Sequence, residues 1–242
     1  MKLLIAIPAY NESKIIEPNV LKLHDYLEKN FSRDDWKIII SDNNSTDDTK
    51  SKVLELIKSS PEIEYIFVQQ KGKGIAIKTA WEKFSADIYV FMDADLSTDL
   101  EALPQLVKAI KDGYDMACGS RFLRESRVQR SFGRKIISWG YHLLLYFVFR
   151  LKVKDAPCGF KAINQKIKNE VLPQVQSIEW FFDSELVILA EKMGYKIKEV
   201  PIFWREQNEK ERKSQVKIFS LAMEYIVKVH ELKRRLKKIK VL

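Results

Sequence analysis

The sequence has few cysteines and lacks long apolar runs, and both shortages restrict what the protein can be. Only two cysteines occur among 242 residues, Cys118 and Cys158, and their spacing fits no metal-binding pattern. We therefore expect free thiols in a reducing compartment. No apolar run reaches the length of a membrane-spanning helix, and one lysine before a short apolar segment does not make a signal peptide. These absences predict a cytoplasmic protein, either free or on the cytosolic face of a membrane.

Two phosphate-binding signatures are also missing. Neither the Gly-x-Gly-x-x-Gly pattern nor a P-loop occurs, which excludes a nicotinamide dehydrogenase and a P-loop enzyme.

The hydrophobic fraction of 46% is enough for a substantial core. The formal charge is +9, with the excess mainly in the second half of the chain. Such an excess indicates an anionic partner: nucleic acid, lipid headgroups or a phosphorylated substrate.

The first half of the chain alternates between short apolar segments and helical patterns. A strand, a loop and a helix follow one another four times, and a fifth strand comes after them. The expected strands are 3–8, 36–42, 65–68, 88–92 and 114–119, and the expected helices are 14–29, 47–59, the segment up to 84, and 100–111. This order predicts an α/β protein with a mostly parallel, doubly wound sheet and right-handed crossovers.

The most informative segment is the buried strand 88–92 and the acidic pair that ends it. Asp93 and Asp95 lie one residue apart at the carboxyl end of that strand, where two carboxylates are costly without a positive partner. Ligands in open α/β sheets bind at this edge. A divalent cation, Mg2+ or Mn2+, that also carries a substrate diphosphate would satisfy both carboxylates. The alternative is an acidic turn in which Ser97 or Asp99 caps the next helix.

Other polar residues follow the neighbouring strands and should meet at the same sheet edge. They are Pro8, Tyr10 and Glu12 after the first strand, Asp42 at the end of the second, and Lys73 in the glycine-containing loop after the third. Asp42 is placed to accept a hydrogen bond from a ribose hydroxyl or a base. Each residue also has a simpler explanation, since Asp42 can cap a helix and Lys73 can be a surface charge. Their convergence favours a nucleotide site.

Together the motifs resemble family 2 glycosyltransferases, and within them the polyprenyl-phosphate hexosyltransferases, the dolichyl-phosphate mannose and glucose synthases. The motifs are Ile7-Pro-Ala-Tyr-Asn-Glu12, Ser41 to Asp47, Lys71-Gly-Lys-Gly74, Asp93-Ala-Asp95, Gly119-Ser-Arg121, Asp155 to Lys161 and Trp180 to Glu185. The resemblance covers roughly residues 1–215 and implies a GT-A (Rossmann-like) fold, a nucleotide-sugar donor, a divalent metal and a lipid-phosphate acceptor.

The resemblance also implies roles for individual residues. Asp93 and Asp95 would hold the metal, and Arg121 and Arg134 would join them in catalysis. The donor site would consist of Pro8, Tyr10, Glu12, Asp42, Lys73, Asp93, Ala94, Asp95, Arg121, Arg205 and Lys213. Arg134 and Ser138 match acceptor-phosphate positions, and Asp183 and Glu185 match residues near the sugar or acceptor. Ser97 stands where mannose synthases often carry glutamine, and the segment 206–212 is longer and more charged than is usual.

Two later segments support the lipid acceptor independently. In the first, an arginine-rich stretch leads into an aromatic, apolar run. The region 134–149 is typical of a helix that lies in a membrane interface. The alternative is a helix buried in the core or in a dimer interface. The tail 216–242 is predicted to be an amphipathic helix whose basic end attracts an anionic leaflet or merely keeps the helix soluble. We expect two units, a GT-A domain over 1–215 and this C-terminal helix.

The function predicted from these residues is an inverting transfer of a hexose, from UDP-glucose or GDP-mannose, to a polyprenyl or dolichyl phosphate at a membrane surface. The phosphate monoester is largely dianionic at neutral pH, so it needs positioning more than a general base. A transferase for a soluble saccharide or protein would need a carboxylate base. A non-catalytic basic protein would explain the charge but not the acidic pair, so no nucleic-acid partner is expected. The sequence leaves the sugar and the oligomeric state open.

Overall fold

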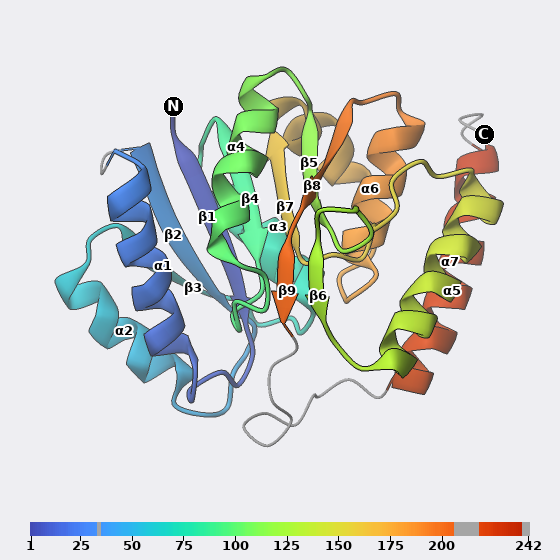
Figure 1. Ribbon diagram of the computed structural model, residues 1–242. Coiled ribbons are helices and arrows are strands. Elements are labelled where there is room, and N and C mark those ends of the chain that lie inside the picture. The colour runs from blue at the N-terminus through green and yellow to red at the C-terminus, as the bar shows by residue number, and fades with distance from the viewer. Residues whose placement is uncertain (33–34, 206–217, 239–242) are drawn as a thin grey trace.

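A seven-stranded sheet with helices on both faces forms the body of the protein (Figure 1). The structure, a computed structural model, describes residues 1–32, 35–205 and 218–238. The strand order is β3-β2-β1-β4-β7-β5-β8, and a separate two-stranded ribbon pairs β6 with β9. The strands are β1 (Leu3–Ala9), β2 (Trp36–Asp42), β3 (Ile63–Phe67), β4 (Ile88–Met92), β5 (Met116–Ser120), β6 (Arg127–Gln129), β7 (Phe160–Asn164), β8 (Ile197–Pro201) and β9 (Phe203–Arg205).

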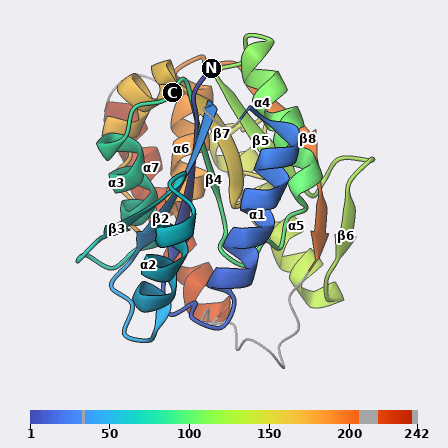
Figure 2. The ribbon, with the colours of Figure 1, turned by 90° about the vertical axis from the view of Figure 1, so that its left-hand side faces the viewer.

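The helices lie in two layers because the strands bury both of their faces. The helical elements are α1 (Ile16–Asn30), α2 (Thr49–Ser59), α3 (Lys73–Lys83), η2 (Leu100–Ala102), α4 (Leu103–Lys111), α5 (Phe132–Phe149), η3 (Ile167–Val171), η4 (Leu172–Gln174), α6 (Phe182–Lys192) and α7 (Ile218–Lys238). Apolar residues of α1, α2 and α4 share one buried cluster with one side of the sheet. Those of α3, α5, α6 and α7 share a second cluster with the other side. Figure 2 shows α3 and α6 on the opposite side of the sheet from α1 and α4.

The expected order of strands and helices is confirmed over the first five strands, with one correction to the sheet. Strand β7 inserts between β4 and β5 and runs antiparallel to both. The sequence reading missed β7 because Lys161 interrupts its apolar pattern, yet Lys161 is fully buried. Because β7 runs in the opposite direction, its first residues meet the last residues of β4, and Phe160 is paired with Met92.

Helices α5 and α7 pack against each other outside α6 (Figure 1). Val229, Leu232 and Leu236 of α7 are buried in the same cluster as α6, so this helix shares the domain's core. The boundary at residue 215 stays a prediction, because it falls outside the described residues. Among the described helices, none combines the length and apolarity that a bilayer crossing requires.

Candidate active site

The carboxyl ends of β1, β2, β4 and β5 and the amino end of β7 face the same edge of the sheet, the lower edge in Figure 1. Parallel pairing places Ala9 beside Asp42, and the β4–β7 pairing brings residues 155–159 beside the acidic pair. The sheet thus gathers five loops that are distant in sequence. The polar residues predicted from these loops do meet there, with the exceptions given below.

An ion triplet lies at the centre of this edge. The Lys73 ammonium is 2.8 Å from Asp93 Oδ1 and 2.8 Å from Asp183 Oδ2. The side chains of Lys73 and Asp183 are almost fully buried, whereas that of Asp93 is 41% exposed. Burial acts to lower the pKa of Lys73, but the two carboxylates outweigh it and raise the pKa. For Asp183 burial prevails and raises the pKa, although Lys73 opposes it.

The loop after Asp93 turns sharply. Leu96 has a left-handed φ of 47°, and Asp95 Oδ1 accepts a hydrogen bond of 3.0 Å from the Ser97 backbone N–H. The Ala94 carbonyl accepts one from Asn19 Nδ2 at 2.8 Å. Asp99 caps η2 by accepting from the Glu101 backbone N–H. The acidic-turn alternative expected Ser97 or Asp99 to cap the next helix, and Asp99 does so. This cap does not involve Asp93 or Asp95, which remain at the sheet edge.

Asp42, which is predicted to line a nucleoside site, is a buried carboxylate. Asp42 is 1% exposed, and its two oxygens accept hydrogen bonds from the Ser45 backbone N–H at 2.9 Å and the Tyr65 hydroxyl at 2.8 Å. Burial and this bond to a carboxylate raise the pKa of Tyr65. Lys71 donates to the Tyr10 hydroxyl at 3.2 Å and lies 5.1 Å from its ring centroid. Asp42 is thus held by its own loop and by Tyr65, which the sequence reading did not select.

Pro8 and Glu12 frame the loop after β1. Pro8 pairs with Ser41 inside the sheet, and β1 continues for one more residue, Ala9. Glu12 is buried, and its backbone N–H donates to Thr49 Oγ1 at 2.8 Å. Between them Asn11 has a left-handed φ of 56°, and its side chain accepts from the Thr46 backbone N–H at 2.8 Å. These hydrogen bonds attach the loop after β1 to the loop after β2.

Arg121 follows β5 and is bound to a buried carboxylate. Its Nε and Nη2 donate to the two oxygens of Asp155 at 2.8 and 2.6 Å, and its backbone N–H also donates to Asp155. Burial acts to raise the pKa of Asp155, but the Arg121 charge and hydrogen bonds outweigh it and lower the pKa. Trp204 lies under the guanidinium, 5.8 Å from ring centroid to Cζ, and under that of Arg130 at 5.3 Å. Asp155 takes two of the five N–H donors that the guanidinium carries.

The segment before β7 packs tightly against the acidic pair. A Cβ built on Gly159 would lie only 2.2 Å from Asp93 Oδ2, so a larger residue there would displace the carboxylate. Lys161 follows in the strand, fully buried, and its ammonium donates to the Cys158 carbonyl and lies 5.4 Å from the Phe91 ring centroid. Its charge adds to the lowering of the Asp155 pKa by Arg121 and opposes the rise that burial causes in the Asp183 pKa. Cys118 and Cys158 are free, as expected, and both are buried.

Several predicted residues lie outside this cluster. Ser138 on α5 accepts a hydrogen bond of 2.9 Å from Arg130, an arginine that the prediction did not choose, and Arg134 is half-buried one turn earlier. Glu185 is buried and accepts from the backbone N–H groups of Gln176 and Ser177 and from Arg235 of α7, so it fixes a loop. Arg205 is exposed and donates to Gln129. Lys213 lies outside the described residues.

The residues the sequence reading left without a role are Asp155, Lys161, Trp204 and Tyr65. Asp155 and Lys161 lie within a motif that carried the resemblance, so the signal was present but not assigned. Tyr65 acts through Asp42, 23 residues away in the chain, and Trp204 through Arg121, 204 − 121 = 83 residues away, and no local pattern links such distant residues.

The carboxylates fit a divalent cation. Asp93 and Asp95 offer the hard oxygen ligands that Mg2+ and Mn2+ prefer. Asp93 is accessible from solvent and already binds one cationic group, the ammonium of Lys73. The Oδ1 atom of Asp183 is buried without a hydrogen bond among the described residues, which leaves further negative charge close to the pair.

Comparisons with known proteins match most of this chain. The family model described as Glycosyl transferase family 2 matches residues 4–172. The chain is 29% identical over 207 residues to the glycosyltransferase AglD of Haloferax volcanii, covering 85% of this chain and 33% of that protein. It is 31% identical over 226 residues to the dolichyl-phosphate beta-glucosyltransferase of Saccharomyces cerevisiae, covering 84% of this chain and 66% of that one. The chain therefore spans a third of the first relative and about two thirds of the second.

Solved structures show the same fold at low sequence identity. Glucosyl-3-phosphoglycerate synthase of Mycobacterium tuberculosis, solved with Mn2+, UDP and glucosyl-3-phosphoglycerate, matches with a TM-score of 0.65 and 18% identity, over 96% of this chain and 79% of that chain. The mannosyltransferase PcManGT of Pyrobaculum calidifontis, solved with GDP-Man and Mn2+, matches with a TM-score of 0.64 and 18% identity. The match covers 97% of this chain and 64% of that chain. The expected GT-A fold is confirmed.

Proposed function

We propose that this chain, which belongs to glycosyl transferase family 2, transfers a hexose from a nucleotide sugar to a polyprenyl phosphate at a membrane surface and inverts the anomeric centre. The observation that carries the proposal is the meeting of Asp93 and Asp95 with Lys73 and Arg121 at one sheet edge. Glucose is the favoured sugar, since several relatives are named dolichyl-phosphate beta-glucosyltransferases. UDP-glucose is then the donor, with GDP-mannose as the alternative.

The donor nucleotide would lie over the loops after β1 and β2. Asp42 is held rigidly by Tyr65 and Ser45, so its orientation is set before a nucleoside arrives. Tyr10 after β1 and Lys71 after β3, which contact each other, offer a ring and a charge beside these loops. Preorganised groups of this kind lower the ordering cost of binding.

The diphosphate would lie over Asp93 and Asp95. A divalent cation bound there would offset the charge that develops on the departing nucleoside diphosphate. Arg121 is fixed by Asp155, and its remaining N–H donors can bind phosphate oxygens without the guanidinium having to reorganise. Lys73 adds a second cation that is anchored between two carboxylates. These side chains bind and orient the leaving group, and none is needed as a base.

The acceptor phosphate would approach from the side of α5. Arg134 and Ser138 are the residues proposed to bind it, and the Arg130–Ser138 hydrogen bond of 2.9 Å adds a second arginine beside them. A phosphate monoester is largely dianionic at neutral pH and attacks without prior deprotonation. Asp183 is buried beneath Lys73 with a raised pKa, and this arrangement suits an anchor for the lysine better than a base for the acceptor.

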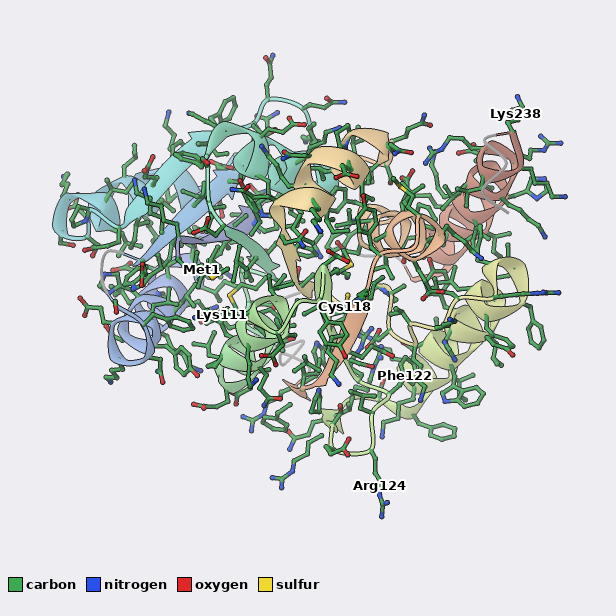
Figure 3. The ribbon with its side chains drawn as sticks, turned by 90° about the horizontal axis from the view of Figure 1, so that it is seen from above. Met1, Lys111, Cys118, Phe122, Arg124 and Lys238 are labelled. Carbon is green, nitrogen blue, oxygen red and sulfur yellow. The ribbon has the colours of Figure 1, made fainter. Side chains whose placement is uncertain are left out.

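The outer side of α5 is the proposed contact with the membrane. Phe132, Ile136, Trp139 and Phe147 fall on one side of the helix and are all exposed, Phe132 to 78% and Phe147 to 75%. Arg124 projects from the preceding loop (Figure 3). Aromatic residues beside basic ones are typical of a helix lying in a headgroup layer. We assign this layer to the cytosolic face of a membrane, which matches a lipid-phosphate acceptor.

One transfer experiment tests the proposal. Radiolabelled UDP-glucose and GDP-mannose are supplied separately with dolichyl phosphate, and with glucose or 3-phosphoglycerate as soluble acceptors, each with Mn2+ or with excess chelator. We expect label in the lipid fraction, from UDP-glucose and with metal only. The variant Asp95→Asn should fold normally, by circular dichroism, and transfer nothing. Label on a soluble acceptor alone would refute the lipid acceptor, and transfer in chelator would refute the metal.

A further inference from the structure

The ammonium of Lys73 lies where a surface lysine would not. Lys73 is the first residue of α3, yet its side chain is only 8% exposed and touches Asp93 and Asp183, which belong to different elements. The backbone beside it is fixed, because the Gly72 N–H donates to Asn43 Oδ1. Phe91 and Trp180 place their ring centroids 5.3 and 5.4 Å from the ammonium. The lysine is therefore tethered inside the site.

This position conflicts with a metal on the same carboxylate. Lys73 Nζ is 2.8 Å from Asp93 Oδ1, and a bound Mg2+ or Mn2+ would lie about 2.0–2.2 Å from a carboxylate oxygen. Two cations sharing one oxygen in a half-buried site repel each other strongly. Asp93 can release the ammonium without leaving it unpaired, since Asp183 Oδ2 holds it on the other side at 2.8 Å.

We propose that the Lys73 ammonium pairs with Asp93 before the divalent metal binds and releases that carboxylate when the metal binds to it. Lys73 then remains paired with Asp183, and its ammonium faces the donor diphosphate. The inference rests on the proposed function of the site. It has two consequences of opposite sign. Lys73 weakens binding of the metal alone, because its contact with Asp93 must break first. It strengthens binding of the nucleotide once metal is present, because the diphosphate replaces the lost partner. Metal and donor then bind cooperatively, each raising the affinity for the other.

The experiment titrates Mn2+ into the protein by calorimetry without any nucleotide. Breaking one charge-assisted contact corresponds to an affinity change of about ten-fold or more. Lys73→Met should therefore bind Mn2+ about ten-fold tighter than wild type. In the presence of saturating Mn2+, the same variant should bind UDP about ten-fold more weakly. Lys83→Met is the matched control, since it removes an exposed charge at the far end of the same helix and should leave both affinities unchanged.

Two further variants keep the test decisive. Lys73→Met leaves the Asp183 carboxylate buried without its ammonium, so the double variant Lys73→Met/Asp183→Asn removes that charge and should show the same gain in Mn2+ affinity. Adding Asp93→Asn to Lys73→Met should abolish the gain, because Asp93 is the contested ligand. Mn2+ affinity equal to or weaker than wild type in both lysine variants would overturn the inference. The readout uses neither sugar nor acceptor, so it can succeed even where transfer to polyprenyl phosphate fails.

Discussion

Gly159 offers a sharp test of how the acidic pair is positioned. A Cβ at this residue would meet Asp93 Oδ2 at 2.2 Å, Cγ at 2.7 Å and Oδ1 at 2.8 Å. A Cβ almost never lies closer than 3.0 Å to another heavy atom, and ordinary van der Waals contact begins at 3.4 Å. In Gly159→Ala the oxygen must therefore move by at least 3.0 − 2.2 = 0.8 Å, and by 3.4 − 2.2 = 1.2 Å to reach ordinary contact. Metal ligands keep their distances within about 0.2 Å. The substitution should therefore disable Asp93 as a ligand while leaving its chemistry intact.

The expected magnitude follows from that displacement. Misplacing a reacting or binding group by about 1 Å costs on the order of 100-fold in rate, or about 2.7 kcal/mol in transition-state stabilisation. We expect kcat/KM of Gly159→Ala to fall about 100-fold in the transfer assay, with Mn2+ affinity falling as well. Asp93 is 41% exposed and can rotate into solvent, so stability should fall by only about 1 kcal/mol, or roughly 2–4 °C in Tm.

A second glycine provides the control. A Cβ on Gly140 of α5 meets no other heavy atom within 4 Å. Gly140→Ala should keep full activity and gain about 0.5–1 kcal/mol of stability, because alanine favours the helix. If Gly159→Ala turned over at the wild-type rate and bound Mn2+ normally, Asp93 would not be a metal ligand and the site would need another assignment.

Three more predictions concern the arginines and the outer helix. Asp155→Asn should destabilise the fold by about 3–5 kcal/mol in urea unfolding, because Arg121 then loses its buried counter-ion. Because Arg121 holds the pKa of Asp155 low, the carboxylate's contribution is complete at neutral pH and is lost as pH falls through its folded-state pKa. Wild-type stability should therefore approach that of the variant in acid, and a constant difference would contradict this. Arg134→Ala should lower kcat/KM for polyprenyl phosphate about ten- to 100-fold and leave donor affinity unchanged in calorimetry, whereas lost donor binding would move the acceptor site elsewhere. Trp139→Ser should lower the affinity for anionic vesicles about ten-fold, measured by co-sedimentation, without changing Tm. An unchanged affinity would show that α5 does not contact the membrane.

The local sequence was enough to place the acidic pair and the nucleoside loops. Strands 3–8, 36–42 and 88–92 are short, continuous apolar runs separated by helical patterns, and parallel packing of such units puts their carboxyl ends together. Asp42, Asp93 and Asp95 therefore had to lie at one edge of the sheet. This part of the site follows from periodicity alone, because each strand is specified by residues adjacent in the chain.

The partners of these residues were decided only by the tertiary structure. Strand β7 enters the sheet antiparallel although Lys161 breaks its apolar pattern, and its reversal brings Gly159 against Asp93. Lys73 and Asp183 are separated by 110 residues, so nothing in either neighbourhood indicates that they meet. A buried charge needs a counter-charge, but the sequence does not say which one. Only the packing of α6 against α3 selects Asp183, and so turns an apparent surface lysine into the central cation of the site.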